Sequence, residues 1–98
     1  MPYLIRTTDK PDMLELRNST RAAHLEYLKA HTSRILAAGA LLNDDGSGGH
    51  GGVIMLDVED RASAEAFIDN DPFTRVGLFA TVEVTRWRKA FFNFECLV

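Results

Sequence analysis

Residues 40–58 read ALLNDDGSGGHGGVIMLDV, and this stretch decides the fold of the chain. Val53–Val58 is apolar on both faces apart from one aspartate, which is typical of a central strand that is covered on both sides. Ala40–Leu42 predicts a shorter strand before it. Between the two, Asn43–Gly52 holds five glycines and the turn dipeptide Asp45-Gly46, so it predicts a hairpin loop. The middle of the chain is therefore predicted to be a β-hairpin.

The segments before the hairpin predict a strand and a helix. Tyr3–Thr8 is short and rich in β-branched and aromatic residues, as strands are. Asp12 and Glu15 have the spacing of a capping box, so we expect a helix to begin near Met13. The helix is expected to run to about Lys29, and its apolar stripe consists of Leu14, Ala22, Leu25 and Leu28.

The segments after the hairpin predict a second helix and a last strand. Asp60 or Ser63 is placed to cap this helix, and Asp71-Pro72 is a typical start for one further turn. Leu78–Trp87 predicts a long strand. The core face of the helix would consist of Ala64, Phe67 and Ile68. The order strand-helix-strand-strand-helix-strand is that of the ferredoxin-like fold, so we predict a βαββαβ α+β sandwich.

The tail after Trp87 is too apolar for a free chain end. Its apolar residues nearly alternate with the others, at Phe92, Phe94, Cys96 and Val98. We therefore expect an extra C-terminal edge strand, either on the sheet of this chain or on that of a neighbouring subunit. Residues 1–98 are predicted to be one domain, with a core at 1–87 and a tail at 88–98.

The composition is that of a small globular protein. The chain has 98 residues, of which 46% are apolar and 26% charged, and its net charge is −3. A domain of this size buries a modest core, so we expect a homodimer or higher homo-oligomer. A net negative chain is a poor partner for nucleic acid.

Cysteine content and hydropathy favour a cytoplasmic protein. Cys96 is the only cysteine, which excludes an intramolecular disulfide and fits a reducing compartment. No apolar run approaches the roughly 20 residues that span a bilayer, so no membrane partner is expected. The first residues lack the layout of a secretory signal.

Two polar clusters about fifty residues apart suggest a site. Arg17, Arg21 and His24 are spaced by four and three residues, so they share one face of the predicted helix. Three potential cations on one stripe repel one another, which favours an anionic ligand. Histidine exchanges protons near neutral pH, and a carboxylate such as Asp71 beside it would complete a pair for general acid–base chemistry. His24 and Asp71 are the candidate catalytic residues, and the arginines are candidate substrate binders.

Each candidate also has a purely structural reading. His24 would be a partly exposed helix histidine. Asp71 before proline is a strong N-cap, a role that is compatible with a contact to histidine. Phe73 and Phe79 are core residues by default, although either would also suit the apolar wall of a substrate pocket. His24 and His31 would lie roughly 10 Å apart along a helix, too far to share a zinc ion, so no metal site is predicted.

Five stretches carry a family resemblance, and together they run across most of the chain as far as Trp87. They are Arg21–Leu28 (RAAHLEYL), Ile35–Leu41 (ILAAGAL), Asp44–Gly46 (DDG), Ala66–Phe73 (AFIDNDPF) and Gly77–Phe79 (GLF). This combination resembles the YciI-like, or YCII-related, family of small α+β proteins. The resemblance implies a ferredoxin-like dimer of the dimeric α/β-barrel type, with a His-Asp pair at His24 and Asp71 as its active site.

The resemblance also implies a class of chemistry. Family relatives include a dehydrochlorinase of chlorinated hydroxyquinols, and the wider superfamily includes muconolactone isomerase. We therefore predict a cofactor-independent lyase, dehydrochlorinase or isomerase that acts on a small anionic cyclic or aromatic metabolite. His24 would be the base, Asp71 would fix its tautomer, and Arg17 or Arg21 would hold a substrate oxyanion. The alternative is a non-catalytic binding or accessory dimer, and a haem or metal oxygenase is disfavoured because potential ligands do not cluster.

Overall fold

The elements follow one another in the order that the sequence predicts. The structure is a computed structural model and describes residues 1–98. Its elements are β1 (Tyr3–Asp9), α1 (Leu14–Ala30), a 3₁₀ turn η1 (Thr32–Arg34), β2 (Ile35–Leu41), β3 (Gly51–Leu56), α2 (Arg61–Asp69), α3 (Pro72–Arg75), β4 (Phe79–Arg86), β5 (Phe91–Phe92) and β6 (Glu95–Cys96). None of the three α-helices is both long enough and apolar enough to cross a bilayer. The predicted βαββαβ fold is confirmed.

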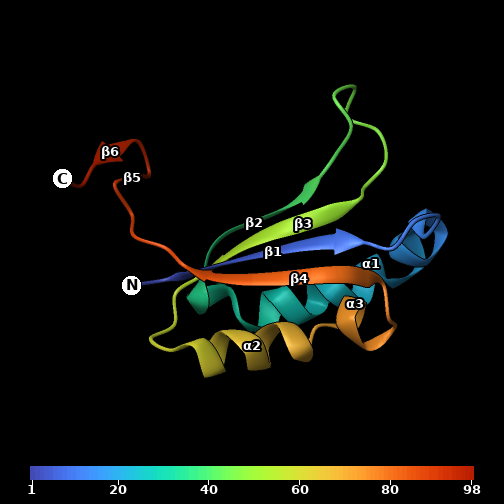
Figure 1. Ribbon diagram of the computed structural model, residues 1–98, viewed down its shortest axis with the longest axis horizontal. Helices are drawn as coiled ribbons and strands as arrows, with labels where there is room; N and C mark the ends of the chain where they lie inside the picture. The colour runs from blue at the N-terminus through green and yellow to red at the C-terminus, as the bar shows by residue number, and fades with distance from the viewer.

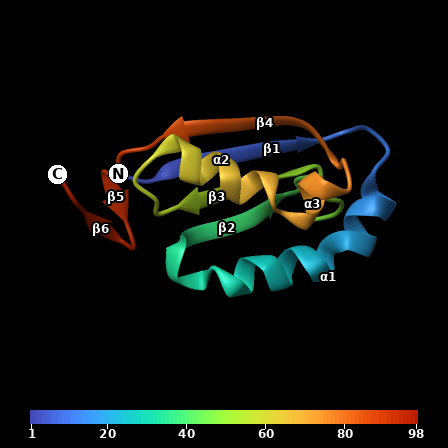
Figure 2. The same cartoon turned by 90° about the horizontal axis from the view of Figure 1, so that it is seen from below.

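The four long strands form one antiparallel sheet in the order β2-β3-β1-β4. All three helices lie against one face of this sheet, as Figures 1 and 2 show from the side and from below. The prediction of a central strand in the second half of the hairpin is confirmed, because β3 lies between β2 and β1. Within this chain, however, β3 is covered by helices on one side only.

The register of the strands decides which side chains face the helices. Ile5 lies opposite Ile54 on one side and Val84 on the other. Because successive side chains alternate between the faces of a sheet, Tyr3, Ile5 and Thr7 all point toward the helices. The buried apolar core between sheet and helices consists of Tyr3, Ile5, Ile54, Leu56, Val58, Ala64, Phe67 and Ile68.

The two longer helices begin differently. Asp60 caps α2 as predicted, and its carboxylate accepts a 2.7 Å hydrogen bond from Ser63 N–H. Helix α1 has no side-chain cap, because Met13 occupies the N-cap position and Asp12 adopts a left-handed turn conformation with φ of 60°. The predicted capping box of Asp12 and Glu15 is therefore wrong.

The second strand is longer than predicted. It begins at Ile35 rather than at Ala40, and a bulge interrupts its pairing between Ile35 and Ala37. The physical reason is the short connection between helix α1 and this strand. Helix α1 stops at Ala30, and the 3₁₀ turn that follows delivers Ile35 directly opposite Leu56.

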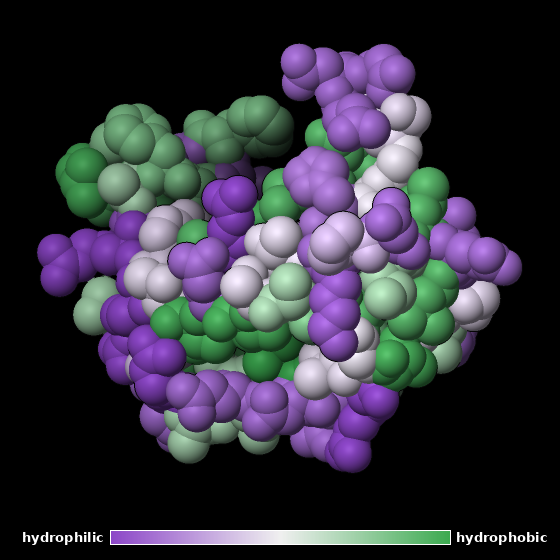
Figure 3. Space-filling model, turned by 45° about the vertical axis from the view of Figure 1, so that its right-hand side comes forward, coloured by the Kyte–Doolittle hydropathy of each residue, from purple (hydrophilic) through white to green (hydrophobic).

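The C-terminal tail forms strands, as predicted, but not at the edge of the sheet of this chain. The short strands β5 and β6 pair only with each other, with Phe91 opposite Cys96. Figure 1 shows this hairpin standing away from the end of the sheet, and Figure 3 shows it as an apolar lobe. Phe94 and Val98 are almost fully exposed. Packing of the tail on a neighbouring subunit stays a prediction.

Candidate active site

His24 and Asp71 meet between helix α1 and the start of helix α3. His24 Nδ1 lies 2.9 Å from both carboxylate oxygens of Asp71. Asp71 is fully buried, and the side chain of His24 is 16% exposed. When Asp71 is ionised, the Nδ1–H of His24 donates this hydrogen bond, and the ring nitrogen Nε2 is left without a protein partner. The two candidate catalytic residues are thus in contact.

Asp71 is held by the backbone as well as by His24. It is the N-cap of α3, and its Oδ1 accepts a 2.8 Å hydrogen bond from Phe73 N–H. Pro72 follows in the first turn, where the N–H that proline lacks has no partner in the helix anyway. The capping role of Asp71 is confirmed, and it coexists with the contact to His24. A buried carboxylate fixed in this way holds the imidazole in one orientation and one tautomer.

Aromatic packing fixes the plane of the His24 ring. Phe73 stacks on it, with the ring centroids 4.1 Å apart and an angle of 18° between the planes. Phe79 packs edge-on against Phe73 at a centroid distance of 6.1 Å. Both phenylalanines line the cavity beside the pair, so they serve as packing residues and as its apolar wall.

Arg17 lines the same cavity, but its guanidinium already has a partner. Its Nε and Nη2 contact the two carboxylate oxygens of Asp9 at 2.6 and 3.0 Å. The side chains of this pair are only 9% and 5% exposed, and the Arg17 guanidinium lies 4.8 Å from the centre of the Phe73 ring. Gly49 of the hairpin loop also packs on Arg17, since a Cβ at that position would lie 2.9 Å from Arg17 Cδ. Arg17 is therefore engaged on several sides.

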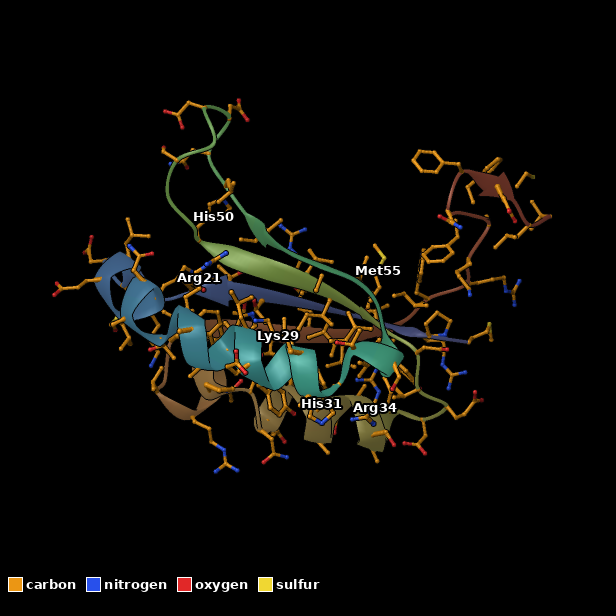
Figure 4. The ribbon with its side chains drawn as sticks, turned by 180° about the vertical axis from the view of Figure 1, so that it is seen from behind. Arg21, Lys29, His31, Arg34, His50 and Met55 are labelled. Carbon is orange, nitrogen blue, oxygen red and sulfur yellow. The ribbon has the colours of Figure 1, made fainter.

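A cavity of about 220 Å³ lies beside the His24–Asp71 pair, between helix α1 and the sheet. Most of its lining residues are apolar, and its polar side chains are Thr7, Arg17, Arg21, His24 and Asp71. Arg21 is exposed and makes no hydrogen bond or ion pair within the chain. Figure 4 shows it extending from α1 toward β2 and β3, at the end of the sheet where His50 lies. Arg21 is thus the free cation of this cavity.

The sequence predictions miss two polar residues of the site. Thr7 lies on the cavity wall and is 3% exposed, and Asp9 binds Arg17. A signal for Thr7 exists, because it follows Tyr3 and Ile5 with a period of two and so brings a hydroxyl to the core-facing side of a strand. Asp9 has no comparable signal, since its pairing with Arg17 depends on how the turn between β1 and α1 folds.

Other polar side chains near the pair have structural roles. Tyr27 donates its hydroxyl to the carbonyl oxygen of Phe67 at 2.7 Å. Burial, and after it the negative charge of Asp71, raises the pKa of Tyr27, so the phenol stays protonated at neutral pH. His31 Nδ1 lies 2.8 Å from the Tyr27 carbonyl oxygen. No group of three or more His, Cys, Asp or Glu side chains is placed to bind one metal ion.

The chain is similar to known sequences over nearly its whole length. Residues 1–88 match the YCII-related domain family. Protein YciI from Escherichia coli O6:H1 is 36% identical over 98 residues, which cover 93% of this chain and 100% of that protein. An uncharacterized protein from Haemophilus influenzae is 31% identical with the same coverage.

Solved structures share the fold. The 5-chloro-2-hydroxyhydroquinone dehydrochlorinase TftG from Burkholderia phenoliruptrix AC1100, in complex with 2,5-dihydroxybenzoquinone, has a TM-score of 0.83 and 35% identity over 90% of this chain and 94% of that chain. An antibiotic biosynthesis monooxygenase has a TM-score of 0.52 and 17% identity over 91% of this chain and 100% of its own, which shows a common fold alone. The predicted ferredoxin-like, dimeric α/β-barrel type of fold is confirmed. By the match over residues 1–88 and the identity to protein YciI, the chain belongs to the YCII-related family.

Proposed function

We propose that this protein is a cofactor-independent enzyme in which His24 is a general base and Asp71 its orienting partner. The observation that carries the proposal is the 2.9 Å contact between His24 Nδ1 and a fully buried carboxylate, at the wall of a cavity. Burying a carboxylate is costly unless its charge has partners. Asp71 is therefore well suited to stabilise the imidazolium that forms when His24 takes up a proton.

Nε2 is the atom of His24 that would receive this proton. Because the Nδ1–H faces Asp71, the neutral ring offers the lone pair of Nε2. In an elimination from the keto tautomer of a chlorinated hydroquinone, the carbon that carries the chlorine also carries a hydrogen. Nε2 removes the proton of a ring hydroxyl, the electron pair of that O–H bond forms a C=O bond, the neighbouring C=C bond shifts toward the chlorinated carbon, and chloride departs with its bonding pair to leave a quinone. In an isomerisation, Nε2 removes a proton from a ring carbon and the imidazolium returns it to a different carbon. A positioned base of this kind typically contributes about 10²–10⁴ in rate.

The substrate class follows from the cavity and from a relative. An apolar cavity of roughly 150 Å³ accommodates benzene, so about 220 Å³ suits a single ring with several substituents. Arg21 offers a cation without a partner for a phenolate or carboxylate oxygen. The relative TftG acts on a chlorinated hydroxyhydroquinone and was solved with a dihydroxybenzoquinone. These observations support a lyase, dehydrochlorinase or isomerase that acts on a small anionic ring.

We also propose that the protein acts as a homodimer that covers the open face of the sheet. Leu4 lies opposite Met55, and both belong to the face turned away from the helices, because their neighbours along each strand point inward. Figure 4 shows Met55 projecting away from the helices. Val53, Ala37 and Leu41 extend this apolar surface over β3 and β2. A second copy would give the central strands the cover on both sides that their apolar character predicts.

Release of chloride tests the proposed chemistry. The purified protein is incubated without oxygen with 5-chloro-2-hydroxyhydroquinone, and chloride is measured by ion chromatography. We expect His24→Asn to lower the rate at least about 100-fold while the circular dichroism spectrum is unchanged. His50→Asn is the matched control, because His50 is exposed and lies outside the cavity lining. A His24→Asn variant with wild-type activity would contradict the assignment.

A non-catalytic binding protein is the alternative on the same scaffold. Arg21 would hold an anionic ring equally well without any proton transfer, since it needs only a charged oxygen. The two functions differ in the fate of the ligand. A ring compound that binds the wild-type protein but is recovered unchanged after long incubation favours a binding protein.

A further inference from the structure

Thr7 carries the one hydroxyl on the cavity wall. It lies on the central strand β1, on the same face as the core residues Tyr3 and Ile5, and is 3% exposed. Its hydroxyl makes no hydrogen bond within the chain. This is uncommon, because buried hydroxyl groups are normally hydrogen-bonded and an unpaired one destabilises the fold.

The Thr7 hydroxyl opens into the cavity. Every side-chain nitrogen or oxygen of the chain that is sealed from solvent has a hydrogen-bond partner. An unpaired hydroxyl must therefore reach open space, and the space that Thr7 lines is the cavity. Gly52, which pairs with Thr7 from β3, helps to keep it open: a Cβ there would lie 3.2 Å from Gly39 O and 3.6 Å from Thr7 Oγ1.

The polar groups of the cavity fall into two sets. Arg17 and Asp71 have strong partners within the chain. Three groups remain free, namely the Arg21 guanidinium, His24 Nε2 and the Thr7 hydroxyl. The first two come from helix α1, whereas the third comes from strand β1 on the sheet side. A ligand between helix and sheet can thus meet polar groups on two opposite walls.

We propose that Thr7 is a specificity-determining residue that hydrogen-bonds an oxygen substituent of the substrate ring. This inference rests on the proposed function at His24 and narrows its substrate class. The ring lies between α1 and the sheet, with one charged oxygen at Arg21 and a second oxygen at Thr7. Because a hydroxyl both donates and accepts, the second oxygen is a hydroxyl, carbonyl or phenolate oxygen. A ring without it leaves Thr7 unpaired and binds poorly.

Thr7→Val and Thr7→Ser separate the hydroxyl from the shape of the side chain. The probe is 2,5-dihydroxybenzoquinone, which has oxygens on opposite edges of its ring, and binding is measured by calorimetry. All proteins carry Cys96→Ser, because the Cys96 thiol is exposed and thiols add to quinones. We expect Thr7→Val to weaken binding about tenfold, the effect of one hydrogen bond to a charged oxygen. Thr7→Ser keeps the hydroxyl and is expected to bind within about twofold of the wild type.

Thermal unfolding distinguishes a role in recognition from a structural role. If the Thr7 hydroxyl stabilised the fold through a hydrogen bond, Thr7→Val would lower the Tm. Because the Thr7 hydroxyl has no partner in the ligand-free protein, Thr7→Val is expected to keep or raise the Tm while it weakens binding. A lower Tm overturns the proposal. So does equal affinity of the wild type and Thr7→Val, and so does a wild-type protein that does not bind the probe.

A failure of the Thr7 proposal can be told apart from a failure of the proposed function at His24. Binding of the probe requires no proton transfer, so His24→Asn tests the chemistry and Thr7→Val tests recognition. Unchanged binding by Thr7→Val with an inactive His24→Asn removes only the specificity role. Full activity of His24→Asn removes the proposed function, whatever Thr7→Val does.

Discussion

His24 and Asp71 are 47 positions apart in the sequence, yet Nδ1 of the histidine lies 2.9 Å from both oxygens of the carboxylate. His24 comes from the middle of α1, and Asp71 is the last residue before α3. Because Phe73 N–H also binds Oδ1, the carboxylate is in position before any ligand arrives. A substitution that keeps the helix cap but removes the charge therefore isolates what Asp71 does for His24.

Asp71→Asn is that substitution. Asparagine caps a helix about as well as aspartate, so α3 should be retained. Its amide cannot stabilise an imidazolium, however, and its NH₂ group facing Nδ1 favours the tautomer with the proton on Nε2. We expect the turnover rate to fall about 1,000-fold. ¹⁵N NMR should show the neutral ring of His24 protonated on Nδ1 in the wild type and on Nε2 in the variant.

Asp60→Asn is the matched control for Asp71→Asn. Asp60 also caps a helix, but it is exposed and does not line the cavity. Its substitution should leave turnover unchanged. Wild-type turnover in Asp71→Asn would show that the contact with His24 has no part in the reaction.

The buried ion pair of Arg17 and Asp9 should matter for stability. Arg17→Met leaves the Asp9 carboxylate buried without its partner, which typically costs about 3–5 kcal/mol. The double variant Arg17→Met with Asp9→Leu removes both charges and should recover much of this loss. Urea unfolding measures the free energies. Lys29→Met is the control, since its pair with Glu26 is exposed and contributes about 0–1 kcal/mol.

A small effect of Arg17→Met would reassign this arginine. If its loss of stability is no larger than that of Lys29→Met, the guanidinium is not tied to Asp9 in solution. Arg17 would then be available to hold a substrate oxyanion together with Arg21, as the spacing of the two arginines along the helix predicts.

Local patterns predict most of the fold because each element carries its own signal. The apolar run at Val53–Val58 and the glycine-rich turn before it predict the hairpin, and Asp60 predicts the start of α2. The predictions fail where the signal is ambiguous. Ile35–Ala37 is an apolar run that suits a helix end or a strand, and only its pairing with β3 decides for a strand.

The site was predictable in its residue types and less so in its pairings. The stripe of Arg17, Arg21 and His24 follows from helical spacing, and Asp71 from its place before proline. Which arginine stays free could not be predicted, because Arg17 is engaged by Asp9, a residue that enters through the turn before the helix. Contacts of this kind are set by tertiary packing and leave no periodic pattern in the sequence.

The cap at Asp60 predicts how stability changes in acid. The hydrogen bond from Ser63 N–H lowers the pKa of Asp60 below its ordinary range. Such a carboxylate stabilises the fold above its unfolded pKa, about 3.9, and loses this contribution as the pH falls through the lower folded value. Asp60→Asn has a cap that does not titrate, so its free energy of unfolding should fall less steeply below about pH 4.

Urea unfolding at several pH values checks this expectation. Glu65→Gln is a suitable control, because it removes an exposed carboxylate of the same helix that does not cap it. The free energy of unfolding of Glu65→Gln should fall with decreasing pH in parallel with that of the wild type. If the free energy of unfolding of Asp60→Asn also fell in parallel with the wild type, the cap would be irrelevant to stability in acid.

A single charge introduced on the open face of the sheet should prevent the homodimer from forming through that face. Met55→Glu places a carboxylate in the middle of this face, where a second copy would have to bury it, so the homodimer should dissociate to monomers. Light scattering after size-exclusion chromatography measures the mass. Ala23→Glu adds the same charge on the exposed surface of α1 and should leave the mass unchanged. A monomeric wild type would contradict the proposed dimer.

Removal of the C-terminal tail tests separately whether it contributes to the folded core and to the dimer interface. Because β5 and β6 pair only with each other, removal of residues 89–98 breaks no strand pairing in the four-stranded sheet, and residues 1–88 should fold with a nearly unchanged Tm. The exposed apolar side chains of Phe91, Phe94 and Val98 suit packing on a neighbouring subunit, so truncation should weaken the dimer. A truncated chain that unfolds would place the tail in the core. A truncated chain with an unchanged dimer dissociation constant would leave the tail without a role in assembly.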